Sequence, residues 1–288
     1  DENVTIGYYG MAFIDLLSQK DVLRTIDRLP ENKDTEAEFI DKWKQTIGVI
    51  KGFRGAFDSF YSGYMEKDTG AIPRATKEQL NLRKRFLTPD VKKQLFSDSM
   101  IYYASLLERP NREPIASIHA LISGCAGVFL TALSLGFICR GGLEVGIAGE
   151  FFKGEIYGPA LYHAYRLESE VAQYPRIAVG TGMIQYLADE ARTPGDNDRA
   201  TLRRALATRC RSWFCQDADG VIILDYAGPL AHETFPSEGD LVESAVRFAT
   251  KEWNRFTAEQ NHKLAARYFM LSRYITSRWN SVWKPGGT

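Results

Sequence analysis

The stretch from Ile115 to Cys139 constrains the fold more than any other segment, because it contains no Asp, Glu, Lys or Arg. It is long enough to cross a bilayer, and Arg140 follows it as a stop signal would. Against a membrane span, it carries His119 and several Ser and Gly residues, and the sequence has no second segment of this kind. We therefore expect a buried core helix and no stable membrane insertion.

Charge and cysteine content narrow the class of protein. Lys plus Arg and Asp plus Glu balance at 36 each, so the overall charge indicates neither a nucleic acid nor an acidic membrane as partner. The four cysteines form no CxxC pair, and the early apolar run 6–17 is interrupted by Asp15, unlike a secretory signal. We expect free thiols and a cytoplasmic location.

Strand and helix patterns alternate along the first part of the chain. The predicted elements are a strand at 6–14, a helix at 36–65, a polar loop at 66–80, two strands within 91–106 joined by a turn at 96–99, a helix at 115–138 that stops at Arg140-Gly141-Gly142, a strand at 143–152, a helix at 161–172 and a strand at 176–180. The order strand, helix, strand, strand, helix, strand is that of the ferredoxin-like arrangement, an antiparallel sheet with helices on one face. The expected fold class is α+β.

We divide the chain after residue 182. Residues 1–182 form the predicted sheet domain, and residues 183–288 form a mostly helical C-terminal extension that packs on it or at a dimer interface. Within the extension we expect a strand at 221–226 and a helical tail at 241–283. The aromatic residues of that tail recur at helical spacing, which is typical of core positions.

Two acidic residues lie at the tips of predicted strands. Asp15 closes the first strand, and Asp98 lies in the hairpin turn FSDS. In a ferredoxin-like sheet these places are neighbours, and two adjacent carboxylates repel unless a cation lies between them. A pair of Mg²⁺ or Mn²⁺ ions prefers such oxygen ligands and can support an in-line displacement at phosphate. The alternative is that Asp15 caps a helix and Asp98 makes a turn.

Three segments taken together resemble the catalytic domain of class III nucleotide cyclases. They are FIDLLS at 13–18, FSDS at 96–99 and LEVGIAGEFFKGEIYGPALYHAYRLESE at 143–170, and the resemblance covers roughly residues 5–180. The phrases GEIYGPAL and AYRLESE, with YPRIAV at 174–179, are similar to the pyrimidine cyclases of the bacterial antiphage Pycsar systems.

The resemblance implies a two-metal centre. Asp15 and Asp98 would hold two Mn²⁺ or Mg²⁺ ions, with the Leu16 carbonyl as a further ligand. Ser18 stands where the family usually has Gly after the first ligand, and Ser97 replaces the Gly before Asp98. These departures argue against ATP or GTP as the substrate and leave the two-metal chemistry unaffected.

The resemblance also implies catalytic roles on the predicted helix 161–172. Arg166 matches the arginine that stabilises charge developing on the phosphate. Tyr162 stands where the family usually has Asn. The other interpretation of Arg166 is a surface salt bridge with Glu170, four residues later.

Two positions match those that read the base in the family, and here they are Gln94 and Glu155. Gln94 is neither the lysine of adenylate cyclases nor the glutamate of guanylate cyclases. A Gln amide can pair with uracil O4 and N3–H or, flipped, with cytosine, while an ionised Glu155 only accepts. Tyr162 could fill the volume that a pyrimidine leaves free. These residues favour a pyrimidine base but do not distinguish uracil from cytosine. The alternative is that Gln94 is an ordinary strand residue.

The expected function follows from the resemblance. It implies a cyclase that converts UTP to 3′,5′-cyclic UMP and pyrophosphate, signals in antiphage defence, and works as a homodimer in which one subunit supplies the aspartates and the other the arginine. The alternatives are a cytidylate cyclase that converts CTP to cyclic CMP, and a catalytically inactive nucleotide-binding homologue.

Overall fold

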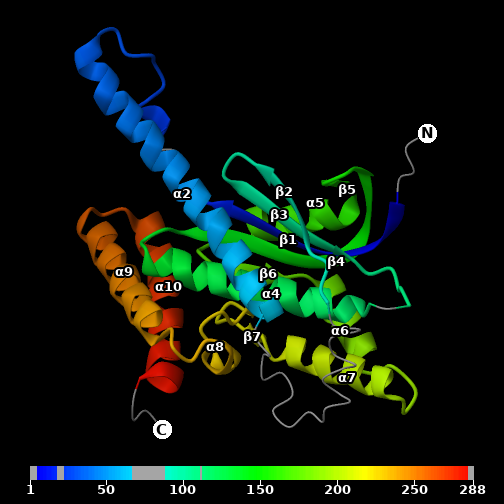
Figure 1. Cartoon of the computed structure of the whole chain (residues 1–288). Helices are drawn as coiled ribbons and strands as arrows, with labels where there is room; N and C mark the ends of the chain where they lie inside the picture. Colours follow the sequence, from blue (N-terminus) through cyan, green and yellow to red (C-terminus); the bar gives the residue numbers. More distant parts are fainter. Residues whose placement is uncertain (1–4, 18–22, 67–87, 111, 285–288) are drawn as a thin grey trace.

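The computed structural model describes residues 5–17, 23–66, 88–110 and 112–284 (Figure 1). Ser18 and nearly all of the predicted loop at 66–80 lie outside the described residues. The first elements are β1 (Thr5–Leu16), α2 (Lys33–Glu66), β2 (Lys92–Phe96), β3 (Ser99–Ser105), α4 (Pro114–Ser134) and β4 (Cys139–Phe152). They are followed by β5 (Glu155–Tyr157), α5 (Pro159–Arg166), the π-helical turn η1 (Leu167–Val171), β6 (Ile177–Val179), α6 (Thr181–Glu190) and α7 (Asp198–Arg211). The chain ends with β7 (Phe214–Gln216), β8 (Ile222–Leu224), α8 (Pro229–Thr234), α9 (Gly239–Ala258), α10 (His262–Arg278) and the π-helical turn η2 (Trp279–Trp283).

The strands form one sheet in the order β2-β3-β1-β4-β6-β8-β7, with β5 paired to β4 off this path. The central strand β1 pairs antiparallel with both β3 and β4, and β2 pairs antiparallel with β3. The predicted order of elements and the α+β class are therefore confirmed. The β4–β6 pair is parallel, so the complete sheet is mixed and extends beyond the four strands.

The apolar segment found first in the sequence is α4, and it forms the centre of the core. It is the one helix in the described ranges that is long and apolar enough to cross a membrane, and 94% of its most apolar window is buried. The helix ends at Ser134, and Gly136, two residues later, has a φ of +81°. The predicted stop at Arg140-Gly141-Gly142 is wrong, because these residues belong to β4.

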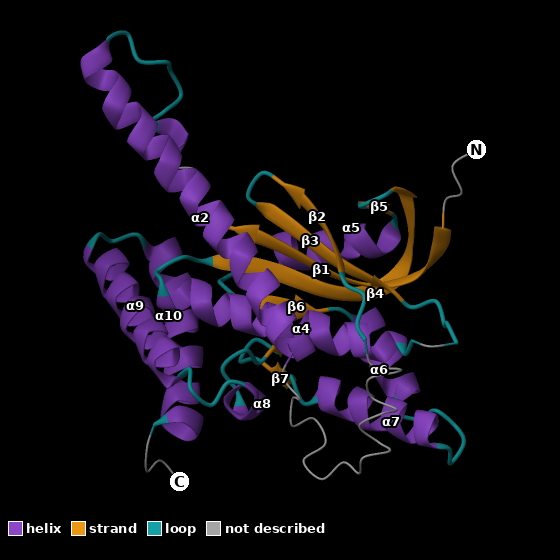
Figure 2. Cartoon of the chain, viewed as in Figure 1, coloured by secondary structure: helices purple, strands orange, loops and turns teal. Residues whose placement is uncertain are grey.

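Helices cover both faces of the sheet, so the expectation of helices on one face is wrong (Figure 2). Residues Ala12, Ile14 and Leu16 of β1 face the core that contains α4. Tyr9 and Met11 face the opposite side and belong to a smaller cluster that contains residues of α5. Because β1 buries both sets of side chains, its apolar run is nearly continuous and covers two layers.

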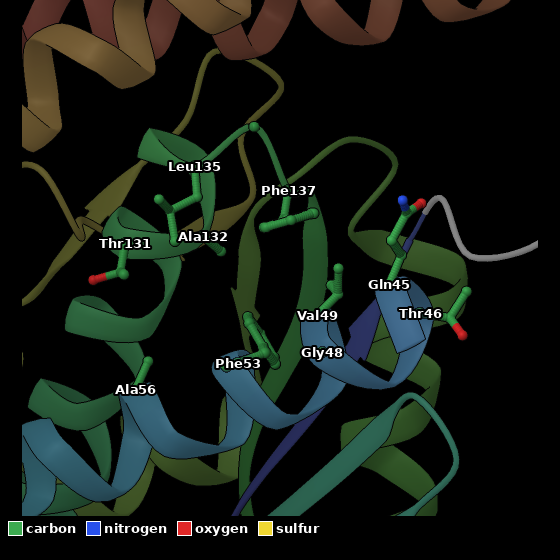
Figure 3. Close-up of a pocket in the computed structure, with 12 residues that line it drawn as sticks. Gln45, Thr46, Gly48, Val49, Phe53, Ala56, Thr131, Ala132, Leu135 and Phe137 are labelled. Atoms are coloured by element: carbon green, nitrogen blue, oxygen red, sulfur yellow. The ribbon is translucent and has the colours of Figure 1, made fainter. Parts of the chain in front are cut away.

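The helix α2 packs on α4 through its C-terminal half, and its N-terminal half projects from the body (Figure 1). A cavity of about 710 Å³ lies between α2 and the end of α4 (Figure 3). The described residues that line it are apolar apart from Gln45, Thr46 and Thr131, and they include no carboxylate, amine, imidazole or thiol. These residues offer no side chain for acid–base chemistry.

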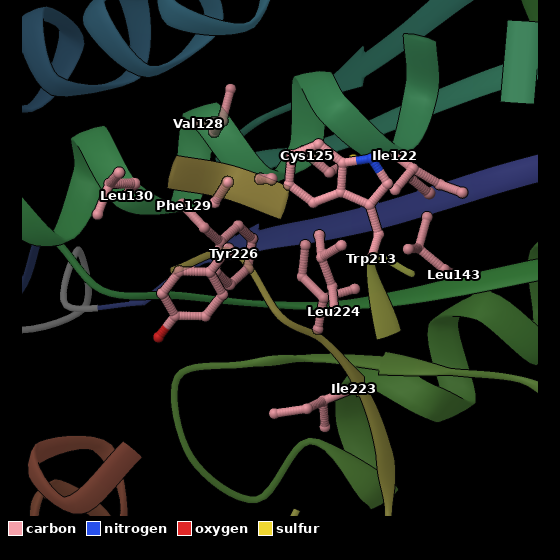
Figure 4. Packing of buried hydrophobic residues seen from close by; sticks show 14 of the residues in the cluster. Ile122, Cys125, Val128, Phe129, Leu130, Leu143, Trp213, Ile223, Leu224 and Tyr226 are labelled. Atoms are coloured by element: carbon pink, nitrogen blue, oxygen red, sulfur yellow. The ribbon is translucent and has the colours of Figure 1, made fainter. Parts of the chain in front are cut away.

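The C-terminal part of the chain shares the main core. Trp213, Leu224 and Tyr226 are buried against α4 and β4 residues (Figure 4). The strands β7 and β8 extend the sheet, and α9 packs on α4. The predicted tail at 241–283 consists of α9, α10 and η2. All four cysteines are free thiols, as expected from their spacing.

Candidate functional site

The structure brings Asp15 and Asp98 together at the end of β1. Asp15 is directly opposite Ser99 in the β1–β3 pair, and the Ser99 hydroxyl donates a hydrogen bond of 2.7 Å to Asp15 Oδ1. Asp98 precedes Ser99, and its carbonyl accepts a hydrogen bond of 3.2 Å from the Leu16 amide. The Leu16 side chain is buried in the main core, so Leu16 can offer only main-chain atoms to a ligand. Topology places both acids where the sequence predicted them.

Two contacts from α2 stabilise the hairpin whose turn carries Asp98. Ser97 has a φ of +52°, a left-handed conformation that favours glycine. The Arg54 guanidinium of α2 donates a hydrogen bond of 2.6 Å to the Ser97 carbonyl, and Lys93 pairs with Asp58 of α2 at 2.7 Å. The helix α2 thus anchors the hairpin.

The donor set at this end of the sheet fits hard divalent cations. Two half-buried carboxylates and a main-chain carbonyl are oxygen ligands of the kind that Mg²⁺ and Mn²⁺ prefer. No group of three or more His, Cys, Asp or Glu side chains that could hold a metal occurs among the described residues. The remaining ligands would have to come from water or from a phosphorylated substrate, which is usual for Mg²⁺.

A second pair of charges, which sequence reasoning missed, lies beside Asp15. Arg140 is the residue opposite Asp15 in β4, and its Nη2 lies 2.5 Å from Glu168 Oε1. Glu168 is only 3% exposed, and its burial raises the pKa of its carboxyl group. Arg140 opposes that rise in pKa, and the charge of Asp15 adds to it. The antiparallel register of β1 and β4 was the signal that could have revealed Arg140.

Arg166 and Tyr162 project from α5 on the same side of the sheet. Arg166 donates hydrogen bonds of 2.9 and 2.5 Å to Glu170, and its guanidinium lies 5.9 Å from the centre of the Tyr162 ring. The alternative role of Arg166, an ion pair with Glu170, is therefore present in the single chain. Both side chains are about half exposed, at 48% and 54%, and exposed ion pairs of this kind are weak.

The helix α5 can lie close to β4 because two glycines face it. A Cβ at Gly142 would lie 2.2 Å from the Ala164 carbonyl oxygen. At Gly146 it would lie 3.3 Å from the Ala160 Cβ. A ring of Phe13 in β1 meets Tyr165 edge to face, with the ring centres 5.5 Å apart. These contacts fix where the helix carries Arg166.

The two positions predicted to read the base are neighbours in the structure. Gln94 of β2 accepts a hydrogen bond of 2.9 Å from the Ile156 amide, and Ile156 follows Glu155 in β5. An amide N–H can only donate, so the atom of Gln94 that faces it is the carbonyl oxygen. The amino group of Gln94 is therefore the donor that remains for other partners. Glu155 is exposed.

A groove of about 680 Å³ runs beside α5 on this face. It is lined by Phe13, Ile101, Tyr157, Leu161, Tyr162 and their neighbours. Tyr157 is 69% exposed and Tyr162 is 55% exposed, so their rings are available to a flat ligand. Exposed aromatic rings in a concave surface are suited to stacking a nucleobase.

The sequence matches no protein-family model, and it gives no significant match among curated proteins.

Proposed function

We propose that this chain is a class III nucleotide cyclase that converts UTP to 3′,5′-cyclic UMP and pyrophosphate. The observation that carries the proposal is the convergence of Asp15 and Asp98 at the end of β1, where the Leu16 amide bonds to Asp98 and Ser99 bonds to Asp15. The antiparallel order β2-β3-β1-β4, with a helix before β2 and another before β4, supports the same family. The resemblance to antiphage cyclases suggests a signalling role in phage defence in the cytoplasm.

Each residue of the site has a chemical role in this proposal. Two bound Mn²⁺ or Mg²⁺ ions would supply activation of the 3′-hydroxyl and neutralise the leaving pyrophosphate. Asp15 and Asp98 bind these ions with their carboxylates, and the Leu16 carbonyl adds a ligand. Arg166 stabilises negative charge on the α-phosphate oxygens as the new bond forms. Tyr162 lines the groove next to Arg166 and packs against the nucleoside.

The amide orientation of Gln94 supports a specific pattern of base recognition. With its carbonyl held by Ile156, the Gln94 amino group donates and the Glu155 carboxylate accepts. Uracil matches this pattern with O4 and N3–H, and cytosine matches it with N3 and its amino group. UTP is our first choice because of the family resemblance, and CTP is the alternative.

A homodimer would complete the site. In the single chain Arg166 contacts Glu170 and Tyr162, whereas Asp15 and Asp98 lie at the end of β1. Two-fold symmetry would bring the arginine of each subunit to the aspartates of the other and create two equivalent sites. Exposed apolar side chains on this face, such as Phe152 at 55% and Tyr157 at 69%, support burial against a second copy.

Subunit mixing tests the shared site. Asp15→Ala and Arg166→Ala should each be nearly inactive, but a heterodimer of the two retains one intact site. After random exchange, half of the dimers are mixed, so the mixture should recover about one quarter of the wild-type activity. Verified heterodimers without activity would contradict the shared site.

Product analysis tests the reaction itself. The protein is incubated with each of the four ribonucleoside triphosphates and Mn²⁺, and the products are identified by mass. We expect cyclic UMP from UTP, and no product with Asp15→Asn or Asp98→Asn. Cyclic CMP alone would indicate the cytidylate cyclase. Calorimetric binding of a non-cyclisable UTP analogue without turnover would indicate an inactive homologue.

A further inference from the structure

Arg140 occupies a position in the sheet that the proposed reaction does not use. It is the cross-strand partner of Asp15 in the antiparallel β1–β4 pair, just as Ser99 is the partner on the β3 side. Side chains directly opposite each other on antiparallel strands project from the same face, with Cβ atoms about 4.5–5.5 Å apart. Arg140 is only 17% exposed and pairs with Glu168, so its positive charge lies, with little water around it, on the face of the sheet that carries Asp15.

The other neighbour of Arg140 is Glu168 in the π-helical turn η1. The Arg140 Nη2 lies 2.5 Å from Glu168 Oε1, and Glu168 is almost fully buried. Glu168 lies two residues after Arg166, at the point where α5 gives way to η1. Arg140 therefore connects the β4 position opposite Asp15 to Glu168, which lies just beyond the helix that carries Arg166. Single π-helical turns at the end of an α-helix are frequent at functional sites.

We propose that Arg140 is a positioning residue that competes with divalent cations for the Asp15 carboxylate and links the metal-binding end of β1 to the turn after Arg166. The inference rests on the proposed function, because it takes Asp15 as a metal ligand. When cations bind, their charge repels the guanidinium, and Glu168 retains it close to the sheet. When cations leave, Arg140 neutralises Asp15 and keeps the two aspartates from repelling each other.

Electrostatics gives the two partners opposite effects on metal binding. Removal of the Arg140 charge with Arg140→Gln should strengthen Mn²⁺ binding, because a positive charge next to the ligand disappears. Removal of the Glu168 charge with Glu168→Gln should weaken Mn²⁺ binding. Arg140 then loses its ion-pair partner, and its positive charge acts on Asp15 alone. We expect each change in the dissociation constant to be about fivefold, within the range for single charges near a protein surface.

The experiment measures free Mn²⁺ by electron paramagnetic resonance while full-length protein is titrated with Mn²⁺ alone. The expected result is a lower dissociation constant for Arg140→Gln and a higher one for Glu168→Gln, with Arg140→Lys close to wild type. A purely structural role for the pair would move both constants in the same direction or leave both unchanged, and either result would overturn the inference.

Two further variants keep the test decisive. The double variant Arg140→Gln/Glu168→Gln leaves no unpaired buried charge, so it replaces Arg140→Gln in the test if that single variant folds poorly. It should bind Mn²⁺ as tightly as we expect for Arg140→Gln. Asp15→Asn separates the two claims. Mn²⁺ binding that does not depend on Asp15 would overturn the proposed function together with this inference, whereas Asp15-dependent binding unchanged in the Arg140 variants would overturn the inference alone.

Discussion

Gly142 lies in close contact with the helix that carries Arg166, and Gly142→Ala tests whether this contact positions the arginine. The added Cβ would lie 2.2 Å from the Ala164 carbonyl oxygen and 2.6 Å from the Leu167 Cβ. Neither of these neighbours is the far end of a flexible side chain. The helix α5 must therefore shift away from the sheet.

The size of the effect follows from these distances. Ordinary van der Waals contact begins at 3.4 Å, so the helix must move by about 1 Å in a core that is densely packed. Overpacking of this kind costs about 1–3 kcal/mol of unfolding free energy. A displacement of about 1 Å in a catalytic group lowers the rate by about 100-fold. We expect both losses in Gly142→Ala.

Gly146→Ala is the matched control, because it makes the same change on the same strand under the same helix. Its Cβ would lie 3.3 Å from the Ala160 Cβ, a distance that needs an adjustment of only a few tenths of an ångström. Urea denaturation measures the stability of both variants, and turnover of UTP with saturating Mn²⁺ measures their activity. Equal losses in the two variants would refute the role of the Gly142 contact.

Three further predictions concern two other parts of the structure. Arg176 is 1% exposed and forms ion pairs with Asp217 and Asp219 at 2.6 Å each. Arg176→Met leaves these carboxylates unpaired, so we expect it to lose about 3–5 kcal/mol of unfolding free energy, measured by urea denaturation. A loss under about 1 kcal/mol would contradict this expectation. The hydrogen bond from Arg176 holds the pKa of Asp219 below its usual value. The stability that this hydrogen bond contributes is present at neutral pH and is lost as the pH falls through the lowered pKa of Asp219. The melting temperature should therefore fall more steeply below about pH 4 in wild type than in Arg176→Met. Equal slopes in the two proteins would contradict this role of the Arg176–Asp219 pair. Gln94→Ala should raise the KM for UTP about tenfold through loss of a hydrogen bond and leave Mn²⁺ affinity unchanged, and an unaltered KM would remove Gln94 from base recognition.

The sequence allowed the first half of the fold to be predicted because its elements are long and strongly patterned. The strand before Asp15, the hairpin around Asp98 and the apolar helix α4 all occur where the pattern indicated. The closeness of the two aspartates in the fold followed from the order of the elements, because β1 ends beside the start of its antiparallel neighbour β3, next to the β2–β3 turn.

Other features depended on tertiary contacts that a local pattern does not contain. The strands β7 and β8 have three residues each and exist through pairing within the sheet, so only β8 was predicted. Gly141 and Gly142 resembled a helix stop, yet both belong to β4, where Gly142 allows close packing of α5 and Gly141 lies against β1 and β6. Arg140 looked like the end of a helix for the same reason, and its place beside Asp15 emerged only from the strand register.

We propose that Asp15 and Asp98 bind two cations at the end of β1. A crystal grown with Mn²⁺ and a non-cyclisable UTP analogue, measured at the manganese absorption edge, tests it most directly. We expect two anomalous peaks about 2.0–2.6 Å from carboxylate oxygens of both aspartates, beside the triphosphate. Manganese bound elsewhere, or aspartate oxygens directed away from the nucleotide, would contradict the account.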